Sequence, residues 1–161
     1  NAPFISRLIT FIRKIFAVGK LLVGICFGHQ IVAHALGGHA AKFDDGWGIG
    51  TMPIKMVGSA DWIPANVDQL DLIHVHQDQV ITLPPDAIRL AQSDFCKNAA
   101  FAIGKRVFAI QGHPEFTNEY AYDVVCKRRD ILGEELFKQT EDSLLKEKSS
   151  YLEVTRWWIS F

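Results

Sequence analysis

The chain has 161 residues, of which 48% are hydrophobic and 22% charged, and this content of apolar side chains excludes an intrinsically disordered protein. Lys and Arg number 17 against 18 Asp and Glu, so the formal net charge of −1 argues against nucleic acid or an anionic membrane as a partner. The length fits a single domain over residues 1–161. Three widely spaced cysteines favour a reducing, cytoplasmic setting over a disulfide scaffold.

The first forty residues alternate between helical and strand patterns. Apolar residues recur at helical spacing from Pro3 and predict an amphipathic helix that ends near Gly19. The apolar run 21–25 predicts a strand buried on both faces, and a helix is expected from 28 to 36. Residues 21–41 carry no Asp, Glu, Lys or Arg, but their glycines, histidines and Gln30 argue against a membrane span. This order is typical of an α/β protein with a parallel sheet.

Shorter strand patterns follow, separated by turn residues. We expect strands at 49–57, 72–75, 88–91, 101–103 and 107–110, the last two forming a hairpin. From Asn118 to about Lys148 the pattern predicts a charged, amphipathic helix. The apolar tail 151–161 fits no element, although it could dock on the sheet.

The sharpest local signal is Cys26, which lies between Gly24 and Gly28 at the junction of the buried strand and the second helix. A chain that turns from strand to helix within one residue strains that residue, and neighbours without a Cβ let the segments pass. Such an elbow projects its side chain from the carboxyl end of the sheet, and the helix N-terminus favours a thiolate there. A buried cysteine in a Gly-rich turn would explain the pentapeptide equally well.

The second signal is the segment 111–116, which follows the strand at 107–110. A thiol nucleophile needs a base to take its proton, and the base needs an acceptor that fixes its tautomer. His113 and Glu115 supply both groups, and Pro114 stiffens the link between them. Together with the cysteine elbow, this pair indicates a Cys-His-Glu catalytic triad.

These two motifs resemble those of the class I glutamine amidotransferases. The resemblance rests on 24–30 (GICFGHQ) and 111–116 (QGHPEF), and it extends from about residue 3 to about residue 131. Two further segments look like the free-standing, single-domain branch found in fungi and plants: 46–50 (GWGIG) and 76–85 (HQDQVITLPP). The resemblance implies an α/β fold with a flavodoxin-like, open, mainly parallel sheet, flanking helices and a small antiparallel section.

The resemblance also implies roles for single residues. Cys26 would attack the side-chain amide of glutamine or a γ-glutamyl group, His113 would protonate the departing amine and Glu115 would orient His113. The backbone N–H of Phe27 would supply an oxyanion donor, and Gln30 would lie near the substrate. No metal and no organic cofactor is implied.

The family's sheet begins with an upstream strand and a Gly-rich loop that gives a second oxyanion donor, so the resemblance implies an N-terminally truncated domain. Loss of one oxyanion donor costs about 100- to 1000-fold in rate. We therefore expect the full-length protein to be active and these 161 residues alone to be inactive. We also expect an exposed apolar edge on the sheet.

Two activities compete within this family: transfer of ammonia to a synthetase partner, and cleavage of γ-glutamyl peptides without a partner. In either case the substrate is a small molecule. One alternative is a catalytically silent binding or regulatory domain of the same fold. Another is a different cysteine-elbow hydrolase, against which Phe27 and the His113/Glu115 pair speak.

The remaining histidines and cysteines carry weaker signals. His29, His34 and His39 recur every five residues, which places them on different sides of a helix and argues against a metal site. His76 is expected to shape the mouth of the pocket, although core packing explains it nearly as well. Cys96 and Cys126 are expected to be ordinary thiols.

Overall fold

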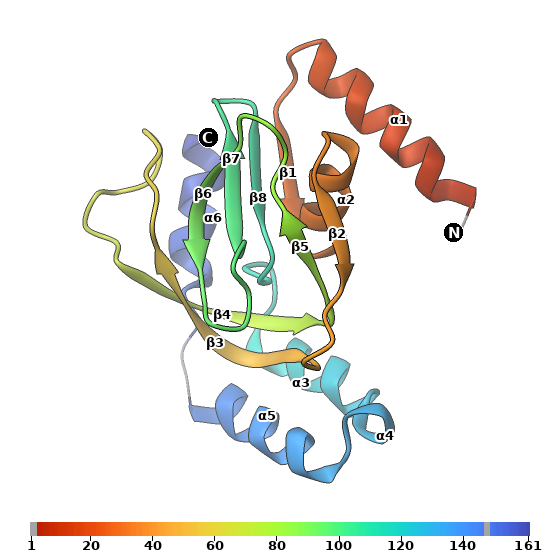
Figure 1. Ribbon diagram of the computed structural model, residues 1–161. Coiled ribbons are helices and arrows are strands. Elements are labelled where there is room, and N and C mark those ends of the chain that lie inside the picture. Colours follow the sequence, from red (N-terminus) through yellow and green to blue (C-terminus); the bar gives the residue numbers. More distant parts are fainter. Residues whose placement is uncertain (1–2, 147–148) are drawn as a thin grey trace.

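The computed structural model describes residues 3–146 and 149–161, which form a mixed sheet with helices on its faces (Figure 1). The helices are α1 (Pro3–Ala17), α2 (Phe27–Ala35), α3 (Asn118–Cys126), α4 (Arg129–Leu132), α5 (Glu134–Lys146) and α6 (Tyr151–Ser160). The strands are β1 (Leu22–Ile25), β2 (His39–Lys42), β3 (Gly48–Met56), β4 (Gln69–His76), β5 (Asp78–Thr82), β6 (Ile88–Gln92), β7 (Ala100–Ile103) and β8 (Val107–Ile110).

The main sheet has the strand order β1-β8-β7-β6-β3-β4, and β2 pairs with β5 in a separate two-stranded sheet. The α/β fold class and the β7-β8 hairpin are confirmed. Only β1 and β8 pair in parallel within the described ranges, so the antiparallel section is larger than we expected. The reason is that β6, β7 and β8 follow one another through links too short for a parallel crossover.

The amphipathic pattern predicted α1, and in the structure α1 and α2 pack on one another beside β1 and β8 (Figure 1). Ile12 of α1 is buried in a cluster with Ile31 and Val32 of α2. Arg13 also donates from Nε to the Ala35 carbonyl at 2.8 Å, which satisfies a carbonyl at the end of α2. These contacts fix α2, and with it the turn that precedes α2.

The tail that the pattern left unassigned is helix α6, which packs behind the sheet (Figure 1). Its Val154 and Trp157 are buried in the core cluster that contains Phe108 and Ile110 of β8. A helix with an apolar face of this kind gains its stability from packing on the sheet.

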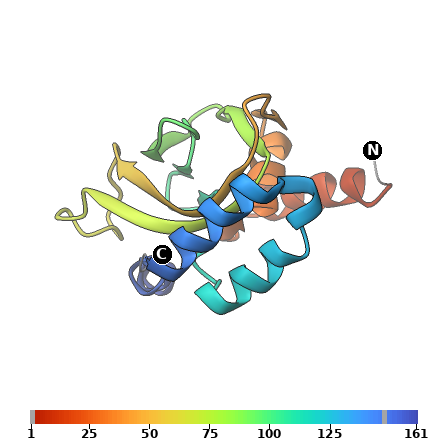
Figure 2. The ribbon, with the colours of Figure 1, turned by 90° about the horizontal axis from the view of Figure 1, so that it is seen from below.

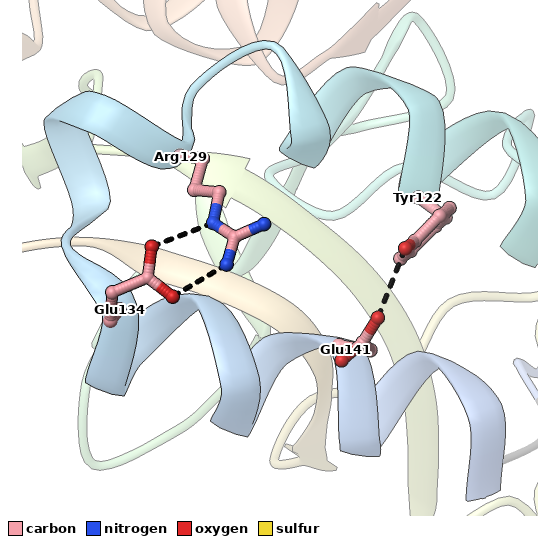
Figure 3. Close-up of polar contacts among 4 residues, drawn as sticks. All are labelled: Tyr122, Arg129, Glu134 and Glu141. Carbon is pink, nitrogen blue, oxygen red and sulfur yellow. Dashed lines mark hydrogen bonds and ion pairs between the residues drawn. The ribbon is translucent and has the colours of Figure 1, made fainter.

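The helix expected from 118 to about 148 is instead three helices, with residues 147–148 outside the described residues. Gly133 ends α4 at a φ of 77°, a conformation that side chains with a Cβ rarely adopt. α5 packs on β3 and α3 on β4, whereas α4 packs on α5 (Figure 2). Figure 3 shows the contacts between them: Arg129 donates two hydrogen bonds to Glu134 at 2.7 and 2.6 Å, and Tyr122 donates to Glu141 at 3.0 Å.

β1 is an end strand of the main sheet, and several apolar side chains around it are exposed. Val18 is 70% exposed, Leu21 57% and Val23 45%. The expected apolar edge is therefore present in this structure. Within the described residues, each helix is either too short or too polar to cross a membrane.

Candidate active site

Cys26 lies between the end of β1 and the start of α2 in a strained backbone conformation. Its φ of 49° and ψ of −104° make it one of two non-glycine residues with positive φ in the described part of the chain. The Cys26 N–H donates to the Ile110 carbonyl at 2.9 Å, and the Cys26 carbonyl accepts from the Gln30 N–H at 3.1 Å. These bonds tie the residue to β8 on one side and to α2 on the other, as the elbow pattern predicted.

The two glycines that flank Cys26 differ in what they allow. A Cβ on Gly24 would lie 2.7 Å from the Gly28 carbonyl oxygen, so Gly24 is needed for the strand and helix to pass. A Cβ on Gly28 would meet no atom within 4 Å. The packing reason that we gave for both glycines therefore holds only for Gly24.

His113 is held beside Cys26 by the segment that follows β8. β1 and β8 pair in parallel with Ile25 opposite Ile110, so residues 26 and 111 leave the sheet at the same edge. The His113 N–H donates to the Ile73 carbonyl of β4 at 2.7 Å and pins the segment across the end of the sheet. The imidazole stacks on Phe116 with ring centroids 4.0 Å apart.

Glu115 holds the imidazole from the other side, because its Oε1 lies 2.7 Å from His113 Nδ1. Burial alone would lower the pKa of His113, but hydrogen bonds and charge interactions with Cys26 and Glu115 outweigh burial and raise it to about 9. The three predicted triad residues are thus brought together, and His113 carries a proton near neutral pH.

The other predicted site residues lie in different surroundings. Phe27 begins α2 and is 47% exposed, and N–H groups in the first turn of a helix have no partner within the helix. Gln30 donates from Nε2 to the Asp78 carbonyl at 2.7 Å. His76 is 4% exposed, and its ring nitrogens lie 3.1 Å from His74 Nδ1 and 3.1 Å from the Asp78 carbonyl. This burial agrees with a packing role for His76, and a place at the mouth of the substrate pocket stays a prediction.

Gln111 contacts Cys26, although the sequence motifs did not indicate a role for its own side chain. It is fully buried, and its Nε2 lies 3.5 Å from Cys26 Sγ. Its position in the sequence could have indicated this contact, because Gln111 immediately follows β8 and so lies at the same sheet edge as Cys26.

The described residues contain no group of three or more His, Cys, Asp or Glu side chains that could hold a metal ion. Burial raises the pKa of the Cys96 thiol to about 12, so Cys96 is an inert thiol near neutral pH. A cavity of about 740 Å³ lies between α3, α5 and α6, but neither Cys26 nor His113 lines it.

The sequence of residues 2–128 matches the family of glutamine amidotransferases of class I. The chain is 33% identical over 149 residues to γ-glutamyl peptidase 3 of Arabidopsis thaliana, covering 86% of this chain and 57% of the relative. It is 28% identical to a glutamine amidotransferase-like protein of Schizosaccharomyces pombe, covering 92% of this chain and 60% of the relative. It is 32% identical over 95 residues to one subunit of the glutamine-hydrolysing GMP synthase of Methanococcoides burtonii, covering 58% of this chain and 50% of the relative.

The fold is also similar to a solved structure, that of a glutamine amidotransferase from Thermotoga maritima. The TM-score is 0.82 at 21% sequence identity, and the similarity covers 98% of this chain and 69% of the solved chain. The chain spans between half and three fifths of the length of the curated relatives named above. By its sequence match over residues 2–128, the chain belongs to the class-I glutamine amidotransferase family, and its relatives include the free-standing plant and fungal branch.

Proposed function

We propose that the full-length protein hydrolyses the γ-glutamyl bond of a small molecule through a thioester on Cys26. One observation carries this proposal. Cys26, in its strained turn between β1 and α2, contacts the imidazole of His113, and His113 Nδ1 is hydrogen-bonded to Glu115. A nucleophile, a base and an orienting carboxylate in this order form the arrangement that acyl transfer requires.

In the proposed reaction, the Cys26 thiolate attacks the γ-carbonyl carbon of the substrate. As the carbon–nitrogen bond breaks, the departing nitrogen takes the proton of His113, and an acyl thioester remains on Sγ. Water then attacks the thioester while His113 takes one of its protons, which frees the γ-carboxylate and restores the thiolate. The raised pKa of His113 supports this role, because the imidazole holds the proton that the leaving amine needs.

The oxyanion that forms on the carbonyl oxygen needs hydrogen-bond donors. The Phe27 N–H belongs to the first turn of α2, where both the free donor and the helix dipole favour negative charge. Gln30 uses its Nε2 on the protein itself, which leaves its carbonyl oxygen as the atom that could accept a hydrogen bond from the substrate.

Of the two activities expected for the family, γ-glutamyl hydrolysis without a partner is the better supported. The relative named γ-glutamyl peptidase 3 matches 149 residues at 33% identity. The relative from GMP synthase matches only 95 residues at similar identity. Ammonia supply to a synthetase is the second candidate, and it rests on that shorter match.

The test is hydrolysis by the full-length protein of a γ-glutamyl dipeptide and of L-glutamine, with an α-glutamyl dipeptide as the negative control. We expect release of the second amino acid from the γ-linked dipeptide, a rate at least 1000-fold lower for Cys26→Ala and an unchanged rate for Cys126→Ala. Ammonia release from glutamine alone would favour the synthetase-linked activity. Absence of both products, or equal rates in Cys26→Ala, would support the catalytically silent alternative.

A further inference from the structure

Gln111 joins the nucleophile to a buried network of polar side chains that the triad does not include. It is fully buried at the end of β8. Its Oε1 lies 3.2 Å from Gln30 Nε2 and 3.3 Å from His29 Nδ1, and its Nε2 lies 3.5 Å from Cys26 Sγ. The amide therefore bridges helix α2 and the sulfur at the apex of the elbow.

The direction of each hydrogen bond in this network is fixed by a backbone carbonyl. The Asp78 carbonyl can only accept, so the Gln30 atom 2.7 Å from it must be the amide nitrogen. That same nitrogen faces Gln111, so the facing atom of Gln111 must be its oxygen. The NH₂ group of Gln111 consequently faces Cys26 Sγ and cannot turn away without placing two donors against each other.

His29 constrains the amide in the same direction. Burial lowers the pKa of His29 to about 3, so its ring is neutral near pH 7 and carries one N–H. With its Nδ1 beside Gln111 Oε1, the ring donates to that oxygen. Two donors thus hold the oxygen of Gln111 and leave its N–H groups for the sulfur.

We propose that Gln111 donates a hydrogen bond from Nε2 to Cys26 Sγ and thereby stabilises the thiolate form of the nucleophile, with Gln30 and His29 fixing its orientation. An amide NH₂ has no acceptor for a thiol proton, so that proton must point elsewhere, and His113 is the base in contact with the sulfur. A hydrogen bond from N–H to an ionised sulfur is stronger than one to a neutral thiol. The proposal rests on the proposed function, because it concerns the same nucleophile.

Other titratable groups lie near His113, the base in contact with Cys26. His113 and Glu115 come from the segment after β8, His29 from α2, and His74 and His76 from β4. Burial lowers the pKa of His29, His74 and His76, so these three rings add no charge near neutral pH. His113 supplies the positive charge, and Gln111 supplies an uncharged donor.

The experiment measures the rate at which iodoacetamide alkylates Cys26 in the full-length protein between pH 5 and pH 9.5, with the Cys26 peptide resolved by mass spectrometry. For Gln111→Leu and Gln111→Glu we expect about a 10-fold slower reaction at pH 7 and a midpoint that moves to higher pH, with little change in the plateau at high pH. For Gln30→Leu, which changes a partly exposed side chain, we expect a smaller shift in the same direction.

The matched control is Gln79→Leu. Gln79 is also a buried amide, at 3% exposed, and it donates to the Phe95 carbonyl at 3.0 Å. Its loss should lower the melting temperature and leave the midpoint of Cys26 alkylation unchanged. Wild-type midpoints in both Gln111→Glu and Gln30→Leu, or an equal shift in Gln79→Leu, would overturn the proposal. Because alkylation needs no substrate, a protein that shows the shift but hydrolyses no γ-glutamyl bond would refute only the proposed function.

Discussion

His113, which lies in the loop after β8, and the buried His29, His74 and His76 have environments that shift their pKa values in opposite directions. His113 is raised to a pKa of about 9 by its hydrogen bonds and charge interactions with Cys26 and Glu115. His29 and His76 are lowered by burial to pKa values of about 3 and 4, and His74 falls well below its ordinary value. Burial lowers the pKa of all four rings, and His29 and His76 also contact uncharged acceptors, so the partners of His113 that can carry negative charge, Cys26 and Glu115, make the difference.

The buried group also has fixed tautomers. His76 Nδ1 lies 3.1 Å from the Asp78 carbonyl and must donate to it, which leaves His76 Nε2 as an acceptor. His74 Nδ1, at 3.1 Å from that nitrogen, must then be the donor. The Asp78 carbonyl also accepts from Gln30, so this neutral chain supports the elbow without taking a proton near pH 7. The comparison teaches that contact with Cys26 and Glu115, which can carry negative charge, separates the pKa of the catalytic candidate from those of the three more deeply buried rings.

The largest expected effect comes from removing His113, the histidine whose pKa is raised. We expect His113→Ala to lower kcat/KM for the proposed hydrolysis by about 10⁴-fold, because both the proton donor and the base are lost. The exposed His34 on α2 offers the control, and His34→Ala should keep the wild-type rate. A loss below about 10-fold in His113→Ala would remove the distinction between the two groups.

Acid should destabilise the protein because the pKa values of His29, His74 and His76 are lowered in the folded state. In the unfolded chain they bind protons near pH 6.5, but in the folded chain they bind them only well below that. Their stabilisation is therefore fully present above about pH 6.5 and is lost as the pH falls toward 4. Three protons give a slope of up to about 4 kcal/mol per pH unit near pH 5. Denaturant unfolding between pH 7 and 4.5 measures it, and His74→Gln should reduce the slope by about one third.

Glu115→Gln should have a smaller effect on catalysis and a specific effect on titration. We expect kcat/KM to fall about 100-fold and the pKa of His113 to drop from about 9 toward its ordinary value, since one of its supporting charges is gone. The stabilisation from the raised pKa is present below about pH 6.5 and is lost as the pH rises through 9, so the variant should lose stability at pH 6 and little above 9. An NMR titration of the imidazole checks the shift, and Glu119→Gln on α3 is the control.

The smallest expected effect concerns the strain at Cys26. Glycine adopts a φ of 49° more easily than residues with a Cβ, so Cys26→Gly should be about 1 kcal/mol more stable than Cys26→Ala. At Ala41, on the strand β2, the replacement by glycine should instead destabilise by about 0.5 kcal/mol. Urea unfolding of Cys26→Gly, Cys26→Ala, Ala41→Gly and the wild type measures both free-energy differences. A Cys26→Gly protein less stable than Cys26→Ala would show that the elbow is relaxed.

The sequence could predict the elbow and the hairpin because both depend on neighbouring residues. Gly24 permits the close passage at Cys26, and the short link after β7 dictates an antiparallel return. The amphipathic pattern likewise predicted α1 within two residues of its end. In each case the determining interactions lie within a few positions along the chain.

The sequence could not predict features that depend on distant contacts. β2 and β5 are short strands that pair with each other, and β2 (HAAK) has no clear apolar alternation. Gln111 and His76 owe their surroundings to contacts with other elements, which spacing along the chain does not reveal. After Asn118 the amphipathic pattern runs on to about Lys148 without a break, but the positive φ of Gly133 ends α4.

The central claim is that Cys26 is a nucleophile activated by His113, and alkylation by a glutamine analogue tests it most directly. The full-length protein is treated with 6-diazo-5-oxonorleucine at pH 7, and the adducts are located by mass spectrometry. The account predicts one adduct, on Cys26, that is absent in His113→Ala. Labelling spread evenly over Cys26, Cys96 and Cys126, or an adduct on Cys26 that forms equally fast without His113, would contradict it.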